Sequence, residues 1–278
     1  MSGNVAGKSI VITGAGSGFG RLVAHRTAAL GAKVTCGDID LAAASAVADG
    51  IHADGGKAIA VAADVTRMED VRTLAQAAVD AHGGIDVMIN NAGIMPLAFM
   101  ADHAAALEAW TRCIDINFKG VMHGIVAVFD QMMAQGRGHV INLSSIYGNH
   151  PVIGAAVYGA TKSAVNFMSE SLRVEARGKI KVTVIRPTGV PVTGLSATVI
   201  NRAAGIGSLG HNMGDFTSMV AQMQSGDFPA ERQNAANIDY ASLAPEHIAD
   251  AIVHAIDQPW GVSISDITVR AAGDHFII

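Results

Sequence analysis

Residues 9–20, which read SIVITGAGSGFG, decide the fold. The stretch begins as a short apolar run, Ser9 to Thr13, typical of a buried strand, and continues into a turn rich in glycine. A helical pattern follows from Phe19 to Leu30, and a second apolar run spans Lys33 to Gly37. Strand, glycine turn, helix and strand in this order predict a βαβ unit with parallel strands.

The same alternation continues along the chain. Helices are expected at 41–52, 68–82, 103–134, 155–177 and 245–256, and strands at 58–63, 86–89, 139–143, 181–185 and 266–269. The strands are apolar nearly throughout, which indicates burial on both faces. We therefore expect one α/β domain over residues 1–278, Rossmann-like and doubly wound, with a seven-stranded parallel sheet and helices on both faces.

Residues 188–243 interrupt this rhythm with Gly, Met, Asn and Ser. The only helical pattern there spans residues 215–224. Ligands bind outside the carboxyl ends of the strands in doubly wound sheets. We expect residues 188–243 to be an insertion that covers the substrate at that edge.

Composition excludes several classes of partner. The net charge is −5, the pI is about 6.1, and no run of Lys and Arg occurs, so neither nucleic acid nor an anionic membrane surface is expected as a partner. The first residues lack a signal-peptide pattern and no apolar run reaches about 18 residues, which predicts a cytoplasmic protein. Cys36 and Cys113 are interpreted as small core residues.

The histidines do not predict a metal site. All 11 are scattered, without ligand spacing, so no metal is expected. His150 lies between Ser145 and Tyr158, where it could line the mouth of a substrate site or be a solvated loop residue.

The glycine turn is a candidate phosphate site. Without side chains, its backbone can approach a pyrophosphate, whose charge is favoured at the N-terminus of the following helix. The alternative is that the glycines only serve a tight turn and close helix packing. The expected cofactor contacts in the turn are Gly14, Ser17, Gly18, Phe19 and Gly20.

Asp38 ends the second strand, 24 residues after Gly14, close to the ~20-residue spacing of the acidic residue that binds the adenosine ribose. Its carboxylate can accept hydrogen bonds from the ribose hydroxyls of NAD and would repel the 2′-phosphate of NADP. Asp38 and Ile39 are therefore expected to contact NAD(H), although Asp38 could instead cap the next helix.

Tyr158 and Lys162 lie at i and i+4 on one expected helix, so they share a face. A free tyrosine titrates at about 10, and a nearby cation favours the phenolate, which suits proton transfer near neutral pH. Ser145 precedes Tyr158 by 13 residues at the end of a strand, with Ser144 as its rival.

Taken in order, TGxxxGxG at residues 13–20, NNAG at 90–93, Ser145 and the Tyr158/Lys162 pair make the chain resemble the short-chain dehydrogenase/reductase family. The resemblance covers residues 9–193 and the last helix and strand. It implies that Tyr158 is the general acid/base, and that Lys162 lowers its pKa and holds the nicotinamide ribose. It also implies that Ser145 hydrogen-bonds the substrate oxygen and that Asn117 positions a water relay to Lys162.

The resemblance implies further cofactor contacts, each with a structural alternative. Asn91, Ala92 and Gly93 would lie beside the cofactor, or only form a turn. Asp64 and Val65 would contact the adenine, or Asp64 would cap a helix. After the sixth strand the family pattern carries one extra residue, so the contacts there are assigned to Pro187, Val190 and Thr193.

These features predict an NAD(H)-dependent oxidoreductase acting on a small-molecule secondary alcohol or ketone. The expected pocket wall is apolar, which favours a hydrophobic and fairly bulky substrate. It comprises residues 94–99 and 146–152 together with Leu195, Ile206, Leu209, Met213, Phe216, Met219 and Met223.

Two other functions remain open at this point: an NADP-linked ketone or sugar reductase, and a non-catalytic NAD/NADH sensor. The resemblance also implies a homo-oligomer, a tetramer or a dimer. Phe276 to Ile278 form an apolar segment that would suit a subunit interface or fold onto its own chain.

Overall fold

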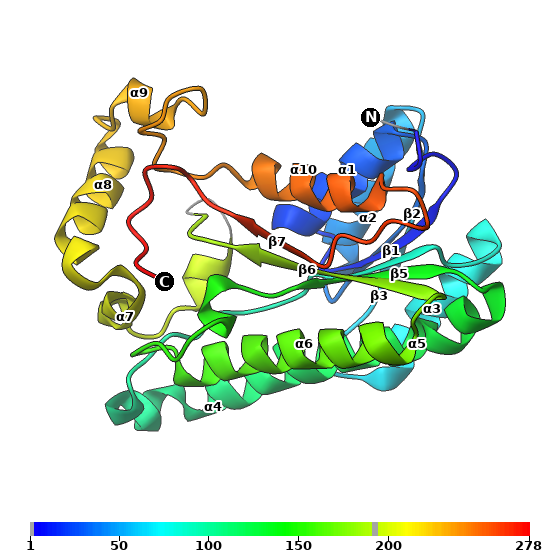
Figure 1. Cartoon of the computed structure of the whole chain (residues 1–278), viewed down its shortest axis with the longest axis horizontal. Helices are drawn as coiled ribbons and strands as arrows, with labels where there is room; N and C mark the ends of the chain where they lie inside the picture. The colour runs from blue at the N-terminus through cyan, green and yellow to red at the C-terminus, as the bar shows by residue number, and fades with distance from the viewer. Residues whose placement is uncertain (1–2, 191–193) are drawn as a thin grey trace.

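A parallel sheet of seven strands forms the centre of the molecule (Figure 1). The computed structural model describes residues 3–190 and 194–278. The strands are β1 (Ser9–Thr13), β2 (Lys33–Asp38), β3 (Lys57–Ala62), β4 (Val87–Asn90), β5 (Gly138–Leu143), β6 (Ile180–Pro187) and β7 (Asp266–Val269), in the order β3-β2-β1-β4-β5-β6-β7. Every neighbouring pair is parallel, so the predicted doubly wound fold is confirmed.

Helices cover both faces of this sheet (Figure 1). One layer contains α1 (Gly18–Ala29), α2 (Leu41–Ala53) and α10 (Pro245–Ile256), and their apolar side chains share one core cluster. The other layer contains α3 (Met68–His82), α5 (Gly120–Gln135) and α6 (Ala156–Glu175), which form the second cluster. The strand order reverses between β1 and β4, and ligands bind at the carboxyl ends of strands beside such a reversal.

The single helix expected over residues 103–134 is interrupted. The chain forms α4 (His103–Ile114), a π-helical turn over Asp115–Lys119, and then α5. The turn places Asn117 in the interior, where its side chain is fully buried. Single π-helical turns within α-helices are frequent at functional sites. No Gly or Pro marks the break, because the first glycine of the region, Gly120, comes only after the turn.

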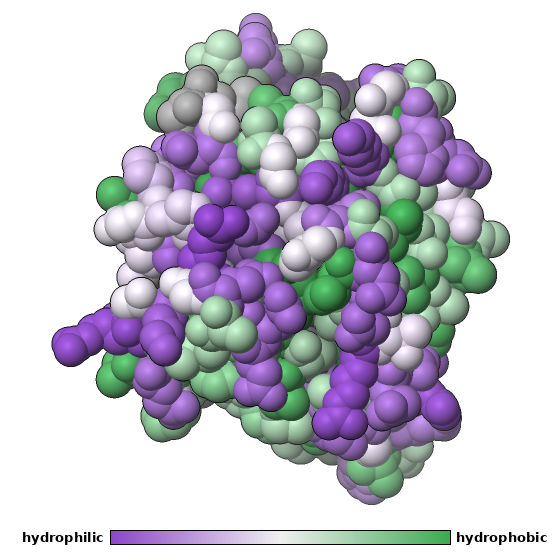
Figure 2. All heavy atoms as spheres, turned by 90° about the vertical axis from the view of Figure 1, so that its right-hand side faces the viewer, coloured by the Kyte–Doolittle hydropathy of each residue, from purple (hydrophilic) through white to green (hydrophobic). Residues whose placement is uncertain are grey.

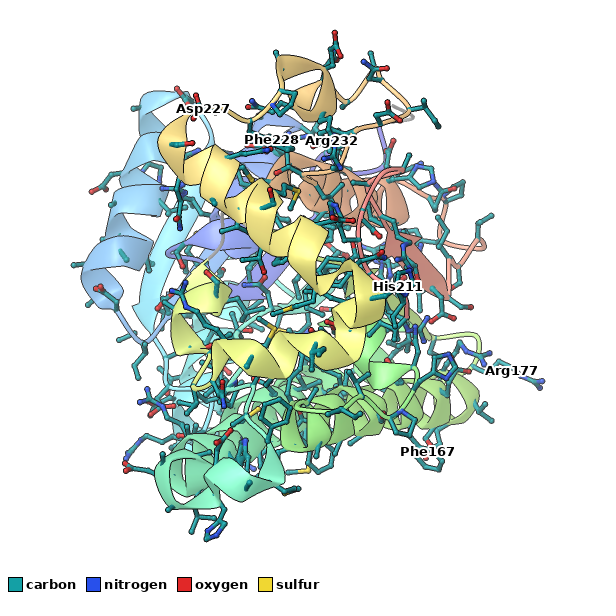
Figure 3. All side chains as sticks on the ribbon, turned by 90° about the vertical axis from the view of Figure 1, so that its left-hand side faces the viewer. Phe167, Arg177, His211, Asp227, Phe228 and Arg232 are labelled. Atoms are coloured by element: carbon teal, nitrogen blue, oxygen red, sulfur yellow. The ribbon has the colours of Figure 1, made fainter. Side chains whose placement is uncertain are left out.

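Residues 194–243 form short helices beyond the carboxyl end of β6 (Figure 1). They include α7 (Ile206–Leu209), α8 (Met213–Ser225) and α9 (Ala230–Gln233), and α8 corresponds to the helix expected at 215–224. Figure 3 shows α7 and α8 crossing this end of the molecule. The opposite end is hydrophilic over most of its surface, with apolar side chains between (Figure 2).

Two of the three methionines of α8, Met219 and Met223, do not join the cluster that contains Tyr158. Met219 and Met223 pack with Phe228 and Ala241 in a cluster of their own, because the apolar stripe of α8 faces the chain that follows it. Phe216 reaches the C-terminal segment, with its ring centroid 5.9 Å from that of Phe276.

Within residues 3–190 and 194–278, no helix has the length and apolarity needed to cross a membrane. The same residues contain no group of three or more His, Cys, Asp or Glu side chains arranged to hold a metal ion.

Candidate active site

The four side chains expected to be catalytic come together at the carboxyl ends of β4 and β5. Tyr158 and Lys162 lie one turn apart on α6, and Ser145 follows β5. Asn117 enters from the π-helical turn. All four are buried, with exposed fractions of 6% or less. Polar groups interact strongly where water is excluded, and each one needs a hydrogen-bond partner there. The partners of these four side chains therefore decide what chemistry the site can perform.

The Tyr158 phenol lies in an apolar cluster that also contains Ile146 and Tyr147. Burial raises the pKa of Tyr158 above its usual value, and a hydrogen bond with the Ser145 side chain opposes that rise. The Tyr147 ring packs edge-on against it, with the ring centroids 5.5 Å apart. The phenol is therefore protonated at neutral pH in this arrangement.

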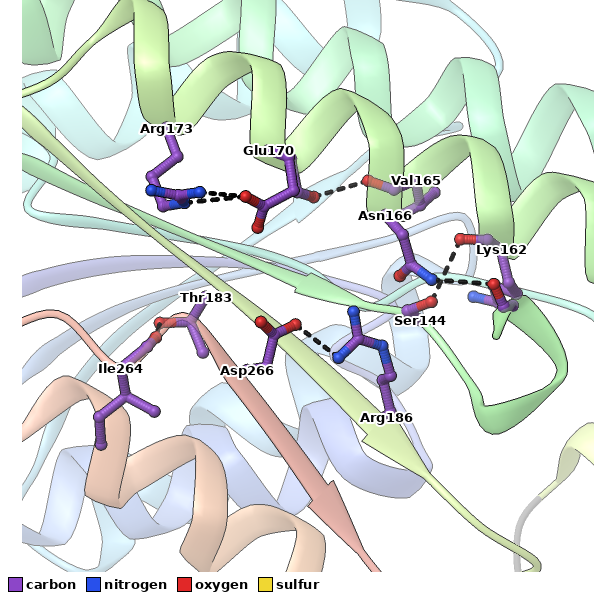
Figure 4. A network of polar contacts seen from close by, with 12 residues as sticks. Ser144, Lys162, Val165, Asn166, Glu170, Arg173, Thr183, Arg186, Ile264 and Asp266 are labelled. Atoms are coloured by element: carbon purple, nitrogen blue, oxygen red, sulfur yellow. Dashed lines mark hydrogen bonds and ion pairs between the residues drawn. The ribbon is translucent and has the colours of Figure 1, made fainter. Parts of the chain in front are cut away.

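Ser144 and Ser145 have different partners, which separates the two candidates. The Ser144 hydroxyl donates to the carbonyl oxygen of Lys162 on α6, at 3.2 Å (Figure 4). The Ser145 side chain interacts with Tyr158, and its hydroxyl also accepts the backbone N–H of Tyr147 at 3.3 Å. Ser145 is thus the serine placed beside the phenol.

Lys162 is held by the sheet. Its Nζ donates to the Leu143 carbonyl oxygen at 2.7 Å and lies 5.8 Å from the centroid of the Tyr158 ring. Burial lowers the pKa of Lys162 to about 8. The sequence led us to expect that this cation lowers the pKa of Tyr158; in the structure burial has the larger effect and raises it.

Asn117 binds the backbone of the segment that follows β4. Its Oδ1 accepts the Ile94 N–H at 2.9 Å, and its Nδ2 donates to the Ile94 carbonyl oxygen at 2.8 Å. The same Nδ2 lies 3.3 Å from the Cys113 sulfur, one turn earlier. Sequence reasoning did not anticipate either partner, although the i, i+4 spacing of Cys113 and Asn117 was a usable signal.

The glycine turn has the geometry of a phosphate cradle. Gly14 and Gly18 have φ angles of 65° and 50°, values that favour glycine. A Cβ atom at Gly20 would overlap the Gly14 carbonyl oxygen. The Ser17 side chain does not cap α1, which leaves the first-turn N–H groups to a ligand. These residues fit a dinucleotide, while Phe19 packs against the neighbouring core cluster.

Asn91 fastens this turn to β4. Its Nδ2 donates to the carbonyl oxygens of Thr13 and Gly14, at 2.9 and 3.0 Å. Thr13 Oγ1 in turn accepts the N–H groups of Asn91 and Ala92. Asn91 therefore has the structural role in the turn that the sequence left open as an alternative to cofactor contact. Gly93, two residues on, faces Asn117 and Lys162.

Asp38 is tied to the glycine turn and does not cap α2. Its Oδ2 accepts the Gly16 N–H at 2.8 Å and its Oδ1 accepts the Asp40 N–H at 3.0 Å. Asp40 is the N-cap of α2 and accepts the Ala43 N–H. Ile39 is 64% exposed, which leaves its side chain free to meet a ligand.

Asp64 and Val65, the expected adenine contacts, follow β3. Asp64 accepts the N–H and hydroxyl of Thr66, and Arg67 is the N-cap of α3, so Asp64 does not cap that helix. Val65 packs against Gly120 of α5.

The last expected cofactor contacts lie at the end of β6 and in the chain that follows it. Pro187 ends β6, Val190 packs against the core, and Thr193 lies outside the described residues. Thr188 Oγ1 is buried without a hydrogen-bond partner among the described residues, which suits a polar ligand group. His150 is exposed, as expected of a solvated loop residue.

A doubly wound sheet that brings a glycine turn, an acidic residue at the end of the second strand and a Tyr, Lys, Ser and Asn set to one edge defines a class of dinucleotide-dependent oxidoreductases. Residues 8–203 match the family described as short chain dehydrogenase. The chain belongs to that family, and the predicted resemblance is confirmed.

Relatives with similar sequences are oxidoreductases. An uncharacterized oxidoreductase of Listeria monocytogenes is 34% identical over 268 residues, which are 95% of this chain and 96% of the relative. The glycine betaine reductase of Emericella nidulans is 30% identical over 96% of this chain, which corresponds to only 19% of that much longer protein.

Solved structures share the fold. A short chain dehydrogenase/reductase of Burkholderia phymatum in complex with NAD has a TM-score of 0.74 and 28% identity, covering 95% of this chain and 89% of that one. An alcohol dehydrogenase of Thermococcus sibiricus complexed with 5-hydroxy-NADP has a TM-score of 0.76, with coverage of 96% and 97%. Its identity is 20%, so that likeness concerns the fold alone.

Proposed function

We propose that the protein transfers a hydride between NAD(H) and a hydrophobic, fairly bulky secondary alcohol or ketone, with Tyr158 as the general acid/base. The observation that carries this proposal is the meeting of Asn117, Ser145, Tyr158 and Lys162 at one edge of the sheet. A protein that only senses NAD/NADH would not need this set.

The chemistry follows from the side chains. A bound nicotinamide dinucleotide supplies or accepts the hydride. During reduction, the Tyr158 hydroxyl donates its proton to the carbonyl oxygen, and the Ser145 hydroxyl stabilises the charge that develops on that oxygen. Lys162 holds the ribose and replaces the Tyr158 proton, through water positioned beside Asn117.

NAD is favoured over NADP by Asp38, whose carboxylate would repel a 2′-phosphate. The acid lies against the glycine turn, where the ribose of a dinucleotide bound to α1 would be. Solved structures of similar proteins contain NAD in one case and NADP in another. The proposed preference for NAD therefore rests on the negative charge of Asp38.

The substrate class is argued from the surroundings of Tyr158. The cluster that contains it is completed by partly buried apolar side chains from two expected wall segments. They are Ile94, Met95, Phe99 and Val152, together with the buried Leu97 and Ile146. Such a wall stabilises an apolar substrate and offers little to the hydroxyls of a sugar.

The test is turnover at 340 nm by wild type and Tyr158→Phe, with NAD(H) and then NADP(H), against aliphatic, aromatic and terpenoid secondary alcohols and ketones. We expect wild-type turnover with NAD(H) and a loss of at least ~10² in kcat for the variant, because its proton donor is gone. Tyr240→Phe is the control, since Tyr240 is buried outside the site and bonds the Ala244 N–H. NAD binding without turnover across the panel would favour a sensor.

A further inference from the structure

The C-terminal segment, residues 270–278, packs with Phe276 and Ile278 against the cluster that contains Tyr158 and is fastened there by hydrogen bonds. The Ile277 N–H donates to the Ser208 carbonyl oxygen at 2.9 Å, and Asn212 Nδ2 donates to that of His275 at 3.0 Å. The segment is therefore attached to α7 and to the turn before α8.

Arg270 also holds this C-terminal segment in place. Its guanidinium donates to the carbonyl oxygens of Phe276 and Ile278, at 2.7 and 2.6 Å. It also pairs with Asp274, whose Oδ1 accepts the Phe276 N–H. A guanidinium bound to two carbonyl oxygens of the same segment restricts that segment to one path. Phe276 is therefore a fixed wall rather than a loose end.

The side chains of the segment alternate between two directions. Phe276 and Ile278 pack against the cluster that contains Tyr158 and Tyr147, whereas Ile277 is 51% exposed. This is the pattern of an extended segment with one face on a core. The segment thus adds two apolar groups to the surroundings of the phenol.

Phe276 fills the space between this cluster and the chain after β6. Its ring lies so close to Gly189 that a Cβ atom there would overlap it. On a further side it meets the ring of Phe216 from α8, at 65° between the ring planes. Phe276 therefore contacts both the apolar cluster that contains Tyr158 and the backbone at Gly189.

We infer that Phe276 is a specificity-determining residue that sets the largest substrate accepted beside Tyr158. The inference rests on the proposed function, because it assumes that a ketone or alcohol binds with its oxygen at Tyr158. Removing the ring opens room for a larger apolar group, and enlarging it closes that room.

The experiment measures binding without turnover. The full chain is saturated with the oxidised dinucleotide, which has no hydride to give, and dissociation constants are measured by calorimetry for 2-butanone and 2-acetylnaphthalene. We expect Phe276→Ala to shift the ratio of the two constants at least ~10-fold in favour of 2-acetylnaphthalene, which corresponds to about 1.4 kcal/mol. Phe276→Trp should shift it in the opposite direction.

Ile277→Ala is the matched control, because it shortens the neighbouring side chain on the exposed face and should leave the ratio within twofold of wild type. Phe276→Leu is a milder variant that should shift the ratio less, in the same direction as alanine. A folded Phe276 variant with the wild-type ratio, or a protein that binds neither ketone, overturns the inference. Shifted binding with no turnover by any variant overturns the proposed function and leaves the size limit standing.

Discussion

At the scale of single residues, the site is organised by side chains that bind the backbone. Lys162 is held by the Leu143 carbonyl at the end of β5, and Asn117 by both backbone groups of Ile94 after β4. The backbone is the most rigid part of a sheet protein, so these contacts restrict where the amine and the amide can lie. Such supporting contacts keep a reactive constellation in place.

Asp38 gives the first prediction. Asp38→Asn removes the negative charge that would repel a 2′-phosphate, and an Asn oxygen can still accept one of the two N–H groups that Asp38 binds. We expect the ratio of kcat/KM for NADP to that for NAD to rise at least ~10-fold. Asp40→Asn, which changes the adjacent helix cap, is the control. An unchanged ratio in Asp38→Asn would show that this acid does not select the cofactor.

His139 gives the second prediction, on stability. Burial lowers the pKa of His139 to about 3, and its Nε2 lies 2.8 Å from the Thr183 hydroxyl, with Lys181 and Lys8 nearby. Between about 3 and 6.5 the unfolded chain binds a proton that the folded chain does not, so stability falls as pH falls through that window. The loss at pH 5 should be about 2 kcal/mol.

The measurement for His139 is urea unfolding at pH 7 and pH 5. His139→Gln removes the titrating group and should flatten the pH dependence, even if the variant is less stable at both values. His150→Gln should retain the wild-type dependence, since His150 is exposed. A wild-type slope in His139→Gln would assign the acid sensitivity to another group.

At the scale of elements, the contact between α5 and β4 depends on a missing side chain. Gly124 of α5 faces Asn90, whose Nδ2 donates to Asn142 Oδ1 at 2.8 Å in the middle of the sheet. The Asn142 amide in turn donates to the Ser169 hydroxyl of α6. This buried chain of polar groups joins the helix that carries Tyr158 to the sheet.

Gly124→Ala is the prediction at this scale. A Cβ atom there would overlap Asn90 Oδ1, so the helix or the amide must move, and we expect a loss of about 1–3 kcal/mol in the free energy of unfolding. Gly214→Ala is the matched control, because Gly214 lies in α8 and an added Cβ there would have no atom within 4 Å apart from its chain neighbours and its own helix backbone. It should stabilise by up to ~1 kcal/mol through helix propensity. Equal effects at both positions would contradict close packing at Gly124.

At the scale of the whole molecule, the helices α4, α5 and α6 expose apolar side chains. The most exposed are Phe167 at 78%, Val174 at 66% and Leu107 at 65%. Figure 3 shows Phe167 extending away from α6. Exposed apolar groups on neighbouring helices are typical of a surface that is covered in an oligomer. We propose that copies of this chain associate through α4, α5 and α6.

Phe167→Asp tests that association. A carboxylate at position 167 would be desolvated without a partner in such an interface, so we expect the mass in solution, measured by light scattering, to fall toward that of one 28.5 kDa chain. Ile238→Asp is the matched control, because Ile238 is also 78% exposed but lies outside these helices. An unchanged mass in Phe167→Asp would place the interface elsewhere or show that the chain is monomeric.

The C-terminal segment illustrates what the whole fold decides. The sequence left Phe276 to Ile278 open between an interface and the chain's own surface. In the structure Phe276 and Ile278 pack on the cluster around Tyr158, and Arg270 fastens them there. Phe276 lies 87 residues after Gly189 in the sequence, and no periodicity relates two positions so far apart.

The sequence by itself determined the sheet, its parallel direction and the set of polar residues at one edge. It could do so because strand and helix periodicities are local, and because the glycine turn, Ser145 and the Tyr158/Lys162 pair follow fixed spacings along the chain. Tertiary structure alone decided the π-helical turn at Asn117, the rise in the pKa of Tyr158 and the place of Phe276. Each depends on burial among residues distant in the sequence, and burial is a property of the packed molecule.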